Sequence, residues 1–206
     1  MEQLNELAFY GLPGAPKSPA ELLPQCRDGE ALGLGSVFLS ERFNMKEVVT
    51  LSGAAGAVTD SLGIATGVTN HNTRHPIVTA SYASTMHLLT GGRFALGLGR
   101  GIDRLFQAFG LPRITTAQLE DFAGLMRRLW QGEVVVGHDG PAGKWPVLVL
   151  DREFRLDIPL ILSAFGPESL KLAGRAFDGV LLHTFFTDET LQRCVKTVRD
   201  EAERVG

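Results

Sequence analysis

The chain has 206 residues, a formal net charge of −3 at pH 7, an apolar share of 44% and a charged share of 21%, a composition typical of one globular domain with one core. This charge gives no electrostatic basis for binding nucleic acid or an anionic membrane, and there is no run of 18 apolar residues to span a bilayer. Cys26 and Cys194 lie far apart in the chain, so we expect reduced thiols in a cytoplasmic protein rather than a disulfide framework or a structural zinc site.

Short apolar runs alternate with helical patterns along the chain. Six strands are predicted, over residues 6–10, 36–40, 62–68, 93–98, 158–163 and 178–183. Six helices are predicted between and after them, over residues 19–33, 46–59, 76–90, 116–131, 167–177 and 187–204. Pro19 and Pro167 stand in the first turns of two of these helices, a position that proline favours. Apolar strands that alternate with helices form parallel sheets covered by helices, so an α/β fold is predicted.

Two α/β architectures compete for this pattern. A doubly wound sheet normally has a glycine-rich turn after its first strand, and the segment YGLPGAP (10–16) lacks the G-x-G-x-x-G spacing. A (β/α) barrel instead places functional residues at the carboxyl ends of many strands. Four predicted strands end in such residues, namely Ser40-Glu41-Arg42, Thr69-Asn70, Gly99-Arg100 and Ala164-Phe165-Gly166. We therefore predict a (β/α)8 TIM-barrel type of fold.

The number of units is too small for a complete barrel. We count six strand–helix units, whereas a closed barrel has eight, commonly in about 250 residues. Residues 132–157 are polar and rich in glycine, and we expect them to form an irregular hairpin that adds no barrel strand. Residues 1–206 are thus predicted to be one barrel domain that lacks its C-terminal units. Open edges and uncovered apolar faces are unfavourable in water, so we expect a poorly soluble or partly molten monomer, or association.

A polar segment, GVTNHNTRHP, follows the third predicted strand at residues 67–76. Gly67 interrupts an apolar run, where glycine indicates a bulge or a close approach of the backbone. Asn70 offers a donor and an acceptor to a planar heterocycle, and Arg74 could hold an anion or a buried carboxylate, or lie on the surface. Pro76 ends the strand and begins a helix. The segment fits either the mouth of an active site or a polar loop.

Two glycine-containing segments are candidate ligand sites. The glycines at 97, 99 and 101 either let a ligand approach the backbone or merely let strand and helix pack closely. Gly166 precedes a helix whose free N–H groups and positive dipole end suit a phosphate. Glu168, in the first turn of that helix, already complements the dipole and opposes an anion if it points inward.

Charged and imidazole side chains supply further candidates. Ser40 could contact a ligand, and Glu41 and Arg42 form either an acid–base pair or a mutual ion pair. We take Glu41 and Arg42 as the candidate catalytic residues. His71 and His75 are four residues apart but lie in a loop without a third ligand, so no metal site is predicted.

The run GVTNHNTRHPIVTASYASTMHLLTGGRFALGLGRG (67–101) closely resembles the luciferase-like monooxygenase superfamily. Its VTN…TRHP and GGRF.LGLG.G elements resemble most the branch that uses the deazaflavin coenzyme F420. The run SAFGPESLKLAGRAFDGVLL (163–182) is similar to the fifth strand, helix and sixth strand of the family. The resemblance extends over roughly residues 6–206.

This resemblance implies a barrel with its cofactor across the carboxyl-terminal mouth. It implies a non-proline cis peptide bond between Gly67 and Val68, behind the deazaflavin ring. It also implies the following contacts: Thr69 and Asn70 with the ring, Gly99, Arg100 and Gly101 along the ribityl chain, and Ala164, Phe165, Gly166 and Pro167 with the phosphate. Relatives commonly carry Asp-His where this chain has Glu41-Arg42, and arginine does not exchange protons near pH 7.

Three functions follow from the resemblance. The first is an F420-dependent oxidoreductase that transfers hydride between C5 of the deazaflavin and a small organic substrate. The second is an FMN-dependent monooxygenase of the same fold. The third is a non-catalytic flavin- or deazaflavin-binding protein or an inactive fragment, which the missing strands and Glu41-Arg42 favour. Full-length relatives pair through helices equivalent to residues 46–60 and 76–90, so a homodimer is expected.

Overall fold

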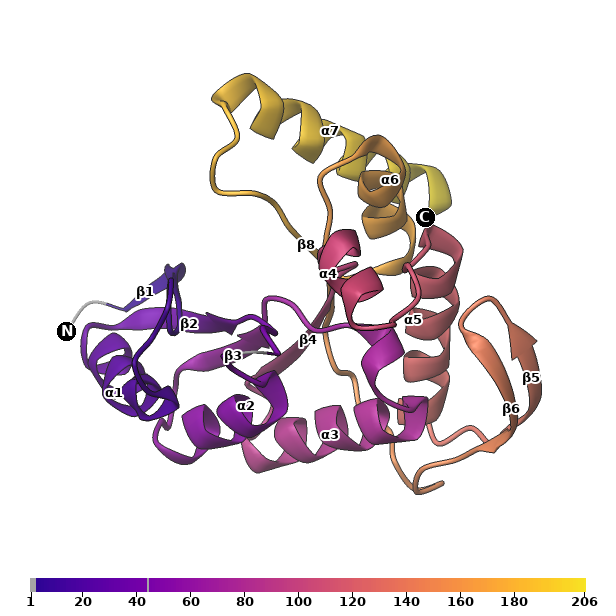
Figure 1. The fold of residues 1–206 in the computed structure, drawn as a ribbon, viewed down its shortest axis with the longest axis horizontal. Coiled ribbons are helices and arrows are strands. Elements are labelled where there is room, and N and C mark those ends of the chain that lie inside the picture. The colour runs from indigo at the N-terminus through magenta and orange to yellow at the C-terminus, as the bar shows by residue number, and fades with distance from the viewer. Residues whose placement is uncertain (1–2, 44) are drawn as a thin grey trace.

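Six parallel strands form the sheet on which the molecule is built (Figure 1). The computed structural model describes residues 3–43 and 45–206. The strands are β1 (Leu4–Tyr10), β2 (Leu34–Leu39), β3 (Gly63–Thr66), β4 (Phe94–Leu98), β7 (Leu160–Ser163) and β8 (Gly179–Leu181). They lie in the order β1-β2-β3-β4-β7-β8, with parallel pairing at each step. The six predicted strands and the incomplete (β/α) barrel are confirmed.

The six predicted helices are also present. They are α1 (Leu22–Ala31), α2 (Val48–Ala57), α3 (Pro76–Leu89), α5 (Thr116–Trp130), α6 (Pro167–Ala176) and α7 (Asp188–Val205). Local capping explains several starts: the Thr115 hydroxyl accepts a hydrogen bond from the Gln118 N–H in a capping box, and the Thr187 hydroxyl accepts one from the Thr190 N–H. In Figure 1, α1, α2 and α3 lie side by side along one face of the sheet.

Three short helices complete the fold. The 3-10 turn η1 (Pro19–Glu21) leads into α1, and η2 (His71–Thr73) lies between β3 and α3. The six-residue helix α4 (Asp103–Ala108) follows β4 and was not predicted. Within residues 3–43 and 45–206, no helix has both the length and the apolar composition needed to cross a membrane.

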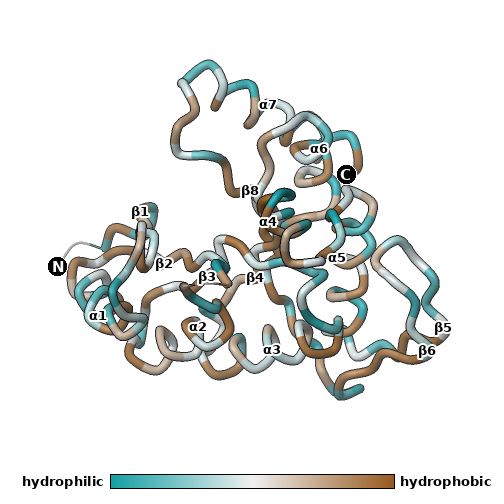
Figure 2. Tube along the Cα trace, viewed as in Figure 1, coloured by the Kyte–Doolittle hydropathy of each residue, from teal (hydrophilic) through white to brown (hydrophobic). Residues whose placement is uncertain are grey.

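The core lies between the sheet and its covering helices. Strand side chains that alternate in direction bury Val37, Leu39, Ile64, Leu96, Leu98, Leu160 and Leu162, and the apolar strands can be followed in Figure 2. Trp130 of α5 is fully buried, and its Nε1 donates a hydrogen bond to the carbonyl of Ala80 in α3 at 3.1 Å. Cys26 and Cys194 are both buried and are not joined in a disulfide.

The segment between α5 and β7 corrects one expectation. Residues 132–157 contain a regular antiparallel hairpin, not an irregular one, made of β5 (Val135–Gly140) and β6 (Gly143–Leu148) in unbroken register. Asp121 of α5 holds it, because the Asp121 carboxylate lies 3.0 Å from His138 Nε2 and accepts the Ala142 N–H at 2.9 Å. The sequence did not indicate a regular hairpin for two reasons. The segment's glycines and prolines are poor strand formers, and the carboxylate that anchors it belongs to α5. As predicted, the hairpin stays outside the parallel sheet.

His71 of η2 makes the fold sensitive to acid. Its ring is 5% exposed and lies edge-on against Phe122 at 5.4 Å, and its Nδ1 has no hydrogen-bond partner in the described part of the chain. Burial lowers the pKa of His71 from 6.5 to about 4, although the negative charge of Asp121 opposes the shift. The unfolded chain therefore binds a proton that the folded chain resists, and stability is lost as the pH falls from about 6.5 towards 4.

For His71→Gln we expect a smaller loss of stability over this pH range than for the wild type, with a difference of up to about 3 kcal/mol. Urea unfolding followed by circular dichroism at pH 7, 6, 5 and 4 measures it. The matched control is His183→Gln, which removes an exposed imidazole and should keep the wild-type slope. Equal slopes for His71→Gln and the wild type would contradict the prediction.

Candidate functional site

The carboxyl ends of the parallel strands surround a cavity of about 1120 Å³. Of the fourteen residues proposed from the sequence, all except Thr69, Ala164 and Pro167 line it. The sequence analysis did not single out a further set of lining residues, namely Tyr10, Phe43, Met45, Ile102, Leu105, Phe106, Phe109, Ser163, Ser169 and His183. The apolar spacing at 102, 105, 106 and 109 is the signal that could have revealed α4 and its cavity-facing residues.

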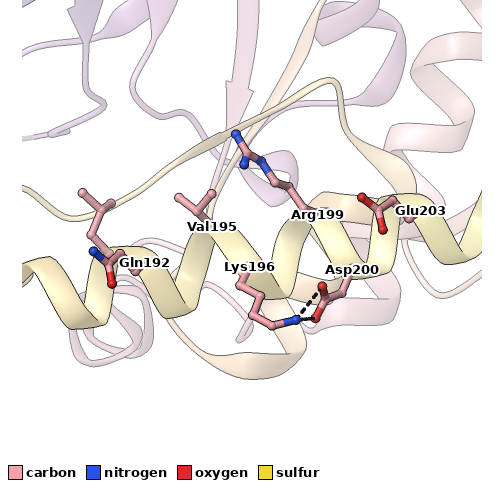
Figure 3. Close-up of a pocket in the computed structure, with 7 residues that line it drawn as sticks. Gln192, Val195, Lys196, Arg199, Asp200 and Glu203 are labelled. Carbon is pink, nitrogen blue, oxygen red and sulfur yellow. Dashed lines mark hydrogen bonds and ion pairs between the residues drawn. The ribbon is translucent and has the colours of Figure 1, made fainter.

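A second hollow, of about 470 Å³, lies along α7 and is lined by Leu191, Gln192, Val195, Lys196, Arg199, Asp200 and Glu203 (Figure 3). Lys196 Nζ forms an ion pair with Asp200 at 2.7 Å across one turn of the helix. This hollow contains no residue of the candidate site, so we place the site at the strand ends.

The segment from Gly67 to Asn70, here called the shelf, is clamped between the ends of β2 and β4. The Gly67 N–H donates to the Leu39 carbonyl at 2.6 Å, and the Thr69 N–H donates to the Gly97 carbonyl at 2.9 Å. Asn70 Nδ2 donates to the Gly99 carbonyl at 2.8 Å. The peptide bond between Gly67 and Val68 is cis, at the position that the family resemblance implied. The shelf thus presents fixed backbone to the cavity.

The glycines at 97 and 99 bring the shelf and β4 together. A Cβ at Gly97 would lie 1.9 Å from the Thr66 carbonyl oxygen, and a Cβ at Gly99 would lie 2.4 Å from Val68 Cγ2. Of the two alternatives for this motif, close packing therefore accounts for both positions, against the backbone of Thr66 at Gly97 and against the side chain of Val68 at Gly99.

An ion-pair network lies behind the shelf. The Glu41 side chain is 1% exposed, and its carboxylate pairs with Arg74 Nη2 at 2.8 Å. Arg74 also pairs with Glu47, the N-cap of α2, and donates to Thr69 Oγ1 at 3.0 Å. The Thr69 hydroxyl donates to Glu41 Oε2 at 3.0 Å. Arg74 therefore holds a buried carboxylate, and Glu41 pairs with Arg74 rather than with its neighbour Arg42.

Basic side chains organise the loop after β1. Lys46 is buried, and its Nζ donates to the carbonyls of Gly11 at 3.0 Å and Leu12 at 2.8 Å. Its ammonium lies 4.5 Å from the centre of the Tyr10 ring. Burial, together with the positive charge of Arg42, lowers the pKa of Lys46 to about 8. The Tyr10 hydroxyl is hydrogen-bonded to Ser40, which links the ends of β1 and β2.

Arg100 lies at the other end of the cavity, beside the first turn of α6. Arg100 Nη1 donates to the Ile114 carbonyl at 3.2 Å, and its Nη2 contacts Thr116 and lies 3.4 Å from Ser169 Oγ in the first turn of α6. Burial, with the nearby charge of Arg113, lowers the pKa of Arg100. Within the described residues Arg100 forms no ion pair with a carboxylate.

The first turn of α6 is open to a ligand. A Cβ at Gly166 would meet no atom within 4 Å. Glu168 does not compete there, because its side chain is largely exposed and pairs with Lys171 at 3.5 Å. The helix N-terminus and the Arg100 guanidinium together suit a phosphate. Across the described residues, no group of three His, Cys, Asp or Glu side chains could hold a metal ion.

Comparisons with known proteins show which family the chain resembles over most of its length. The family model described as luciferase-like monooxygenase matches residues 7–206. The chain is 29% identical over 202 residues to the 5,10-methylenetetrahydromethanopterin reductase of Methanolobus tindarius, an alignment that covers 96% of this chain and 60% of that enzyme.

Solved structures share the fold. An F420-dependent secondary alcohol dehydrogenase, in complex with an F420–acetone adduct, superposes with a TM-score of 0.85 at 22% identity, covering 97% of this chain and 64% of that one. The oxygenating constituent of 3,6-diketocamphane monooxygenase of Pseudomonas putida, in complex with FMN, gives a TM-score of 0.77 at 20% identity, covering 97% and 62%. The chain thus spans about three fifths of the length of these proteins.

Proposed function

Because the chain belongs to the luciferase-like monooxygenase family, we propose that it provides the cofactor-binding part of an F420-dependent oxidoreductase that acts on a small organic substrate. One observation carries the proposal: a single cavity joins the shelf at Gly67–Asn70 to the Arg100 guanidinium at the N-terminus of α6. A flat ring would lie against the shelf, and a phosphate would lie at α6. The F420-dependent secondary alcohol dehydrogenase named above supports this choice of cofactor.

The residues present fit such a cofactor. F420, when bound, supplies a hydride-carrying C5. The backbone of Gly67 and Val68 would support the ring from behind, and Asn70, already fixed by Gly99, would present its amide at the ring's edge. The open turn at Gly166 and the Arg100 guanidinium would hold the phosphate. Glu41, buried in its ion pair with Arg74, would keep Thr69 and the shelf in place rather than act on substrate.

His183 would donate or accept the proton that the substrate gains or loses together with the hydride. Among the described residues that line the cavity it carries the only imidazole. Its Nδ1 accepts the Phe185 N–H at 3.1 Å, so Nε2 carries the proton of the neutral ring. Arg42 cannot take this role near pH 7, and the Glu41 carboxylate is already paired.

Titration of the purified chain with F420 and with FMN tests the cofactor. We expect F420 to bind more tightly, measured by the fluorescence of each cofactor. Tighter binding of FMN would overturn the choice of F420 and support the second candidate, an FMN-dependent monooxygenase, which the FMN-bound camphane enzyme favours. Binding of F420 without turnover of carbonyls or activated alkenes by reduced F420 would support a non-catalytic binding protein.

Gly166→Asp is expected to weaken F420 binding at least tenfold, because a carboxylate at the first turn of α6 repels the phosphate. Space at this position is open, so the substitution does not disturb packing. Gly166→Asn is the matched control, of equal size and without charge, and should bind several-fold more tightly than the aspartate variant. Equal dissociation constants for the wild type and Gly166→Asp would contradict the proposal that the phosphate binds at α6.

The homodimer is also part of the proposal, for a protein that works in the cytoplasm. Val78, Leu88 and Leu89 of α3 are large apolar side chains exposed to solvent, and apolar surface of this kind is typical of subunit interfaces. We expect copies to pair through α2 and α3. Size-exclusion chromatography with light scattering measures the mass, and a Val78→Lys, Leu89→Lys double variant should elute as a monomer. A monomeric wild type would contradict the dimer.

A further inference from the structure

Arg42 brings a second positive charge into the cavity. It follows the end of β2, lines the cavity and is exposed, and among the described residues its side chain donates one hydrogen bond, from Nη1 to the Gly14 carbonyl at 3.1 Å. Among the described residues it forms no ion pair, because the adjacent carboxylate of Glu41 is held by Arg74. Within residues 3–43 and 45–206 the other guanidinium N–H groups make no hydrogen bond, and their planar fork matches a carboxylate.

An aromatic wall stands beside Arg42. Phe43, the next residue, lies 6.1 Å from the ring of Phe106 and 6.3 Å from the ring of Phe109, measured between ring centres. Phe43 and Phe109 are 43% and 53% exposed, so much of their surface faces open space. They also line an adjoining hollow of about 490 Å³ together with Leu111, Asn72 and Thr73. This hollow could take the apolar body of a ligand.

The Arg42 end of the cavity is separate from the phosphate end. Arg42 follows β2, whereas α6 follows β7, which is three strands away in the sheet. At a strand spacing of about 4.8 Å, the two ends are about 14 Å apart. A phosphate held at α6 and Arg100 is therefore too far from Arg42 to pair with it.

We propose that Arg42 and the wall of Phe43, Phe106 and Phe109 bind the carboxylate and the apolar body of the substrate, which is an aromatic or branched aliphatic carboxylic acid. This inference rests on the proposed function, because it names the substrate class of the same cavity. Arg42 pairs with the carboxylate through two N–H groups, and the apolar body lies on the aromatic wall and fills the adjoining hollow. Arg42 thereby sets the specificity of the site for a carboxylate.

Isothermal titration with cinnamate and with cinnamamide tests the proposal. The two probes share an apolar body and differ in charge. We expect cinnamate to bind at least tenfold more tightly than cinnamamide to the wild-type chain. Arg42→Gln should remove that preference, and Arg42→Lys should keep part of it. Phe43→Ala should weaken both probes. Arg27→Gln, an exposed arginine of α1 that lines none of these hollows, is the control and should behave as the wild type.

Parallel titrations of Arg42→Gln with F420 separate this inference from the proposed function. We expect F420 to bind Arg42→Gln within about twofold of the wild type. Loss of F420 binding with unchanged cinnamate binding would assign Arg42 to the cofactor and overturn the inference. Loss of cinnamate binding in Arg100→Gln, but not in Arg42→Gln, would overturn it as well. The chain could also bind cinnamate through Arg42 but bind neither F420 nor FMN. That result would support the carboxylate site and overturn the proposed function.

Discussion

Arg74→Met is expected to destabilise the fold by about 3–5 kcal/mol, because it leaves a buried carboxylate without its counter-charge. The Glu41 side chain is 1% exposed and that of Arg74 16%, so water cannot replace the lost partner. Hydrogen bonds from the Val48 N–H at 3.2 Å and from Thr69 remain, but neither donor carries a charge. The burial of Glu41 is thus tolerated only while Arg74 is present.

Urea unfolding at pH 7 measures this loss, and two further variants define its cause. Arg128→Met removes a surface ion pair with Glu133, whose two partners are nearly half exposed, and should cost much less than Arg74→Met. The double variant Glu41→Met, Arg74→Met removes both buried charges and should recover part of the stability lost in Arg74→Met. A loss in Arg74→Met no larger than that in Arg128→Met would contradict the structural role of the pair.

Gly97→Ala is expected to prevent folding altogether. Its Cβ would lie 1.9 Å from the Thr66 carbonyl oxygen, and this atom belongs to the backbone of β3. Thr66 and Gly97 are also joined by two hydrogen bonds of 2.7 Å through the Thr66 hydroxyl. The two strands cannot separate without breaking these bonds, and a loss above about 4 kcal/mol exceeds what most single substitutions cause.

The yield of soluble protein and its circular dichroism spectrum report the outcome for Gly97→Ala. Gly124→Ala is the matched control, because a Cβ at this position in α5 meets no atom within 4 Å. We expect that variant to gain up to about 1 kcal/mol, since alanine is the better helix former. A folded Gly97→Ala protein with wild-type stability would show that β3 and β4 are not held as close as the structure places them.

Local patterns along the chain were enough to predict the elements of the barrel. The apolar periods at 36–40, 62–68 and 93–98 predicted β2, β3 and β4 to within a few residues, because burial on both faces of a parallel strand leaves a nearly continuous apolar run. Pro76 and Pro167 predicted the first residues of α3 and α6, because proline is suited to that position. The motif at 67–101 predicted where the shelf and the cavity would lie.

Only the tertiary structure decided which partners the side chains at the strand ends contact. Glu41 was a candidate partner of Arg42, its neighbour, but its partner is Arg74, 33 residues away. The wall beside Arg42 joins Phe43 to two rings of the segment that contains α4, and the hairpin took a regular form because Asp121 of α5 anchors it. Such contacts depend on strand register and on the paths of loops, which bring residues far apart in the sequence next to one another. The sequence alone therefore determined the elements and the edge of the sheet at which the cavity lies, whereas register and loop paths determined which charged side chains pair with one another among the described residues.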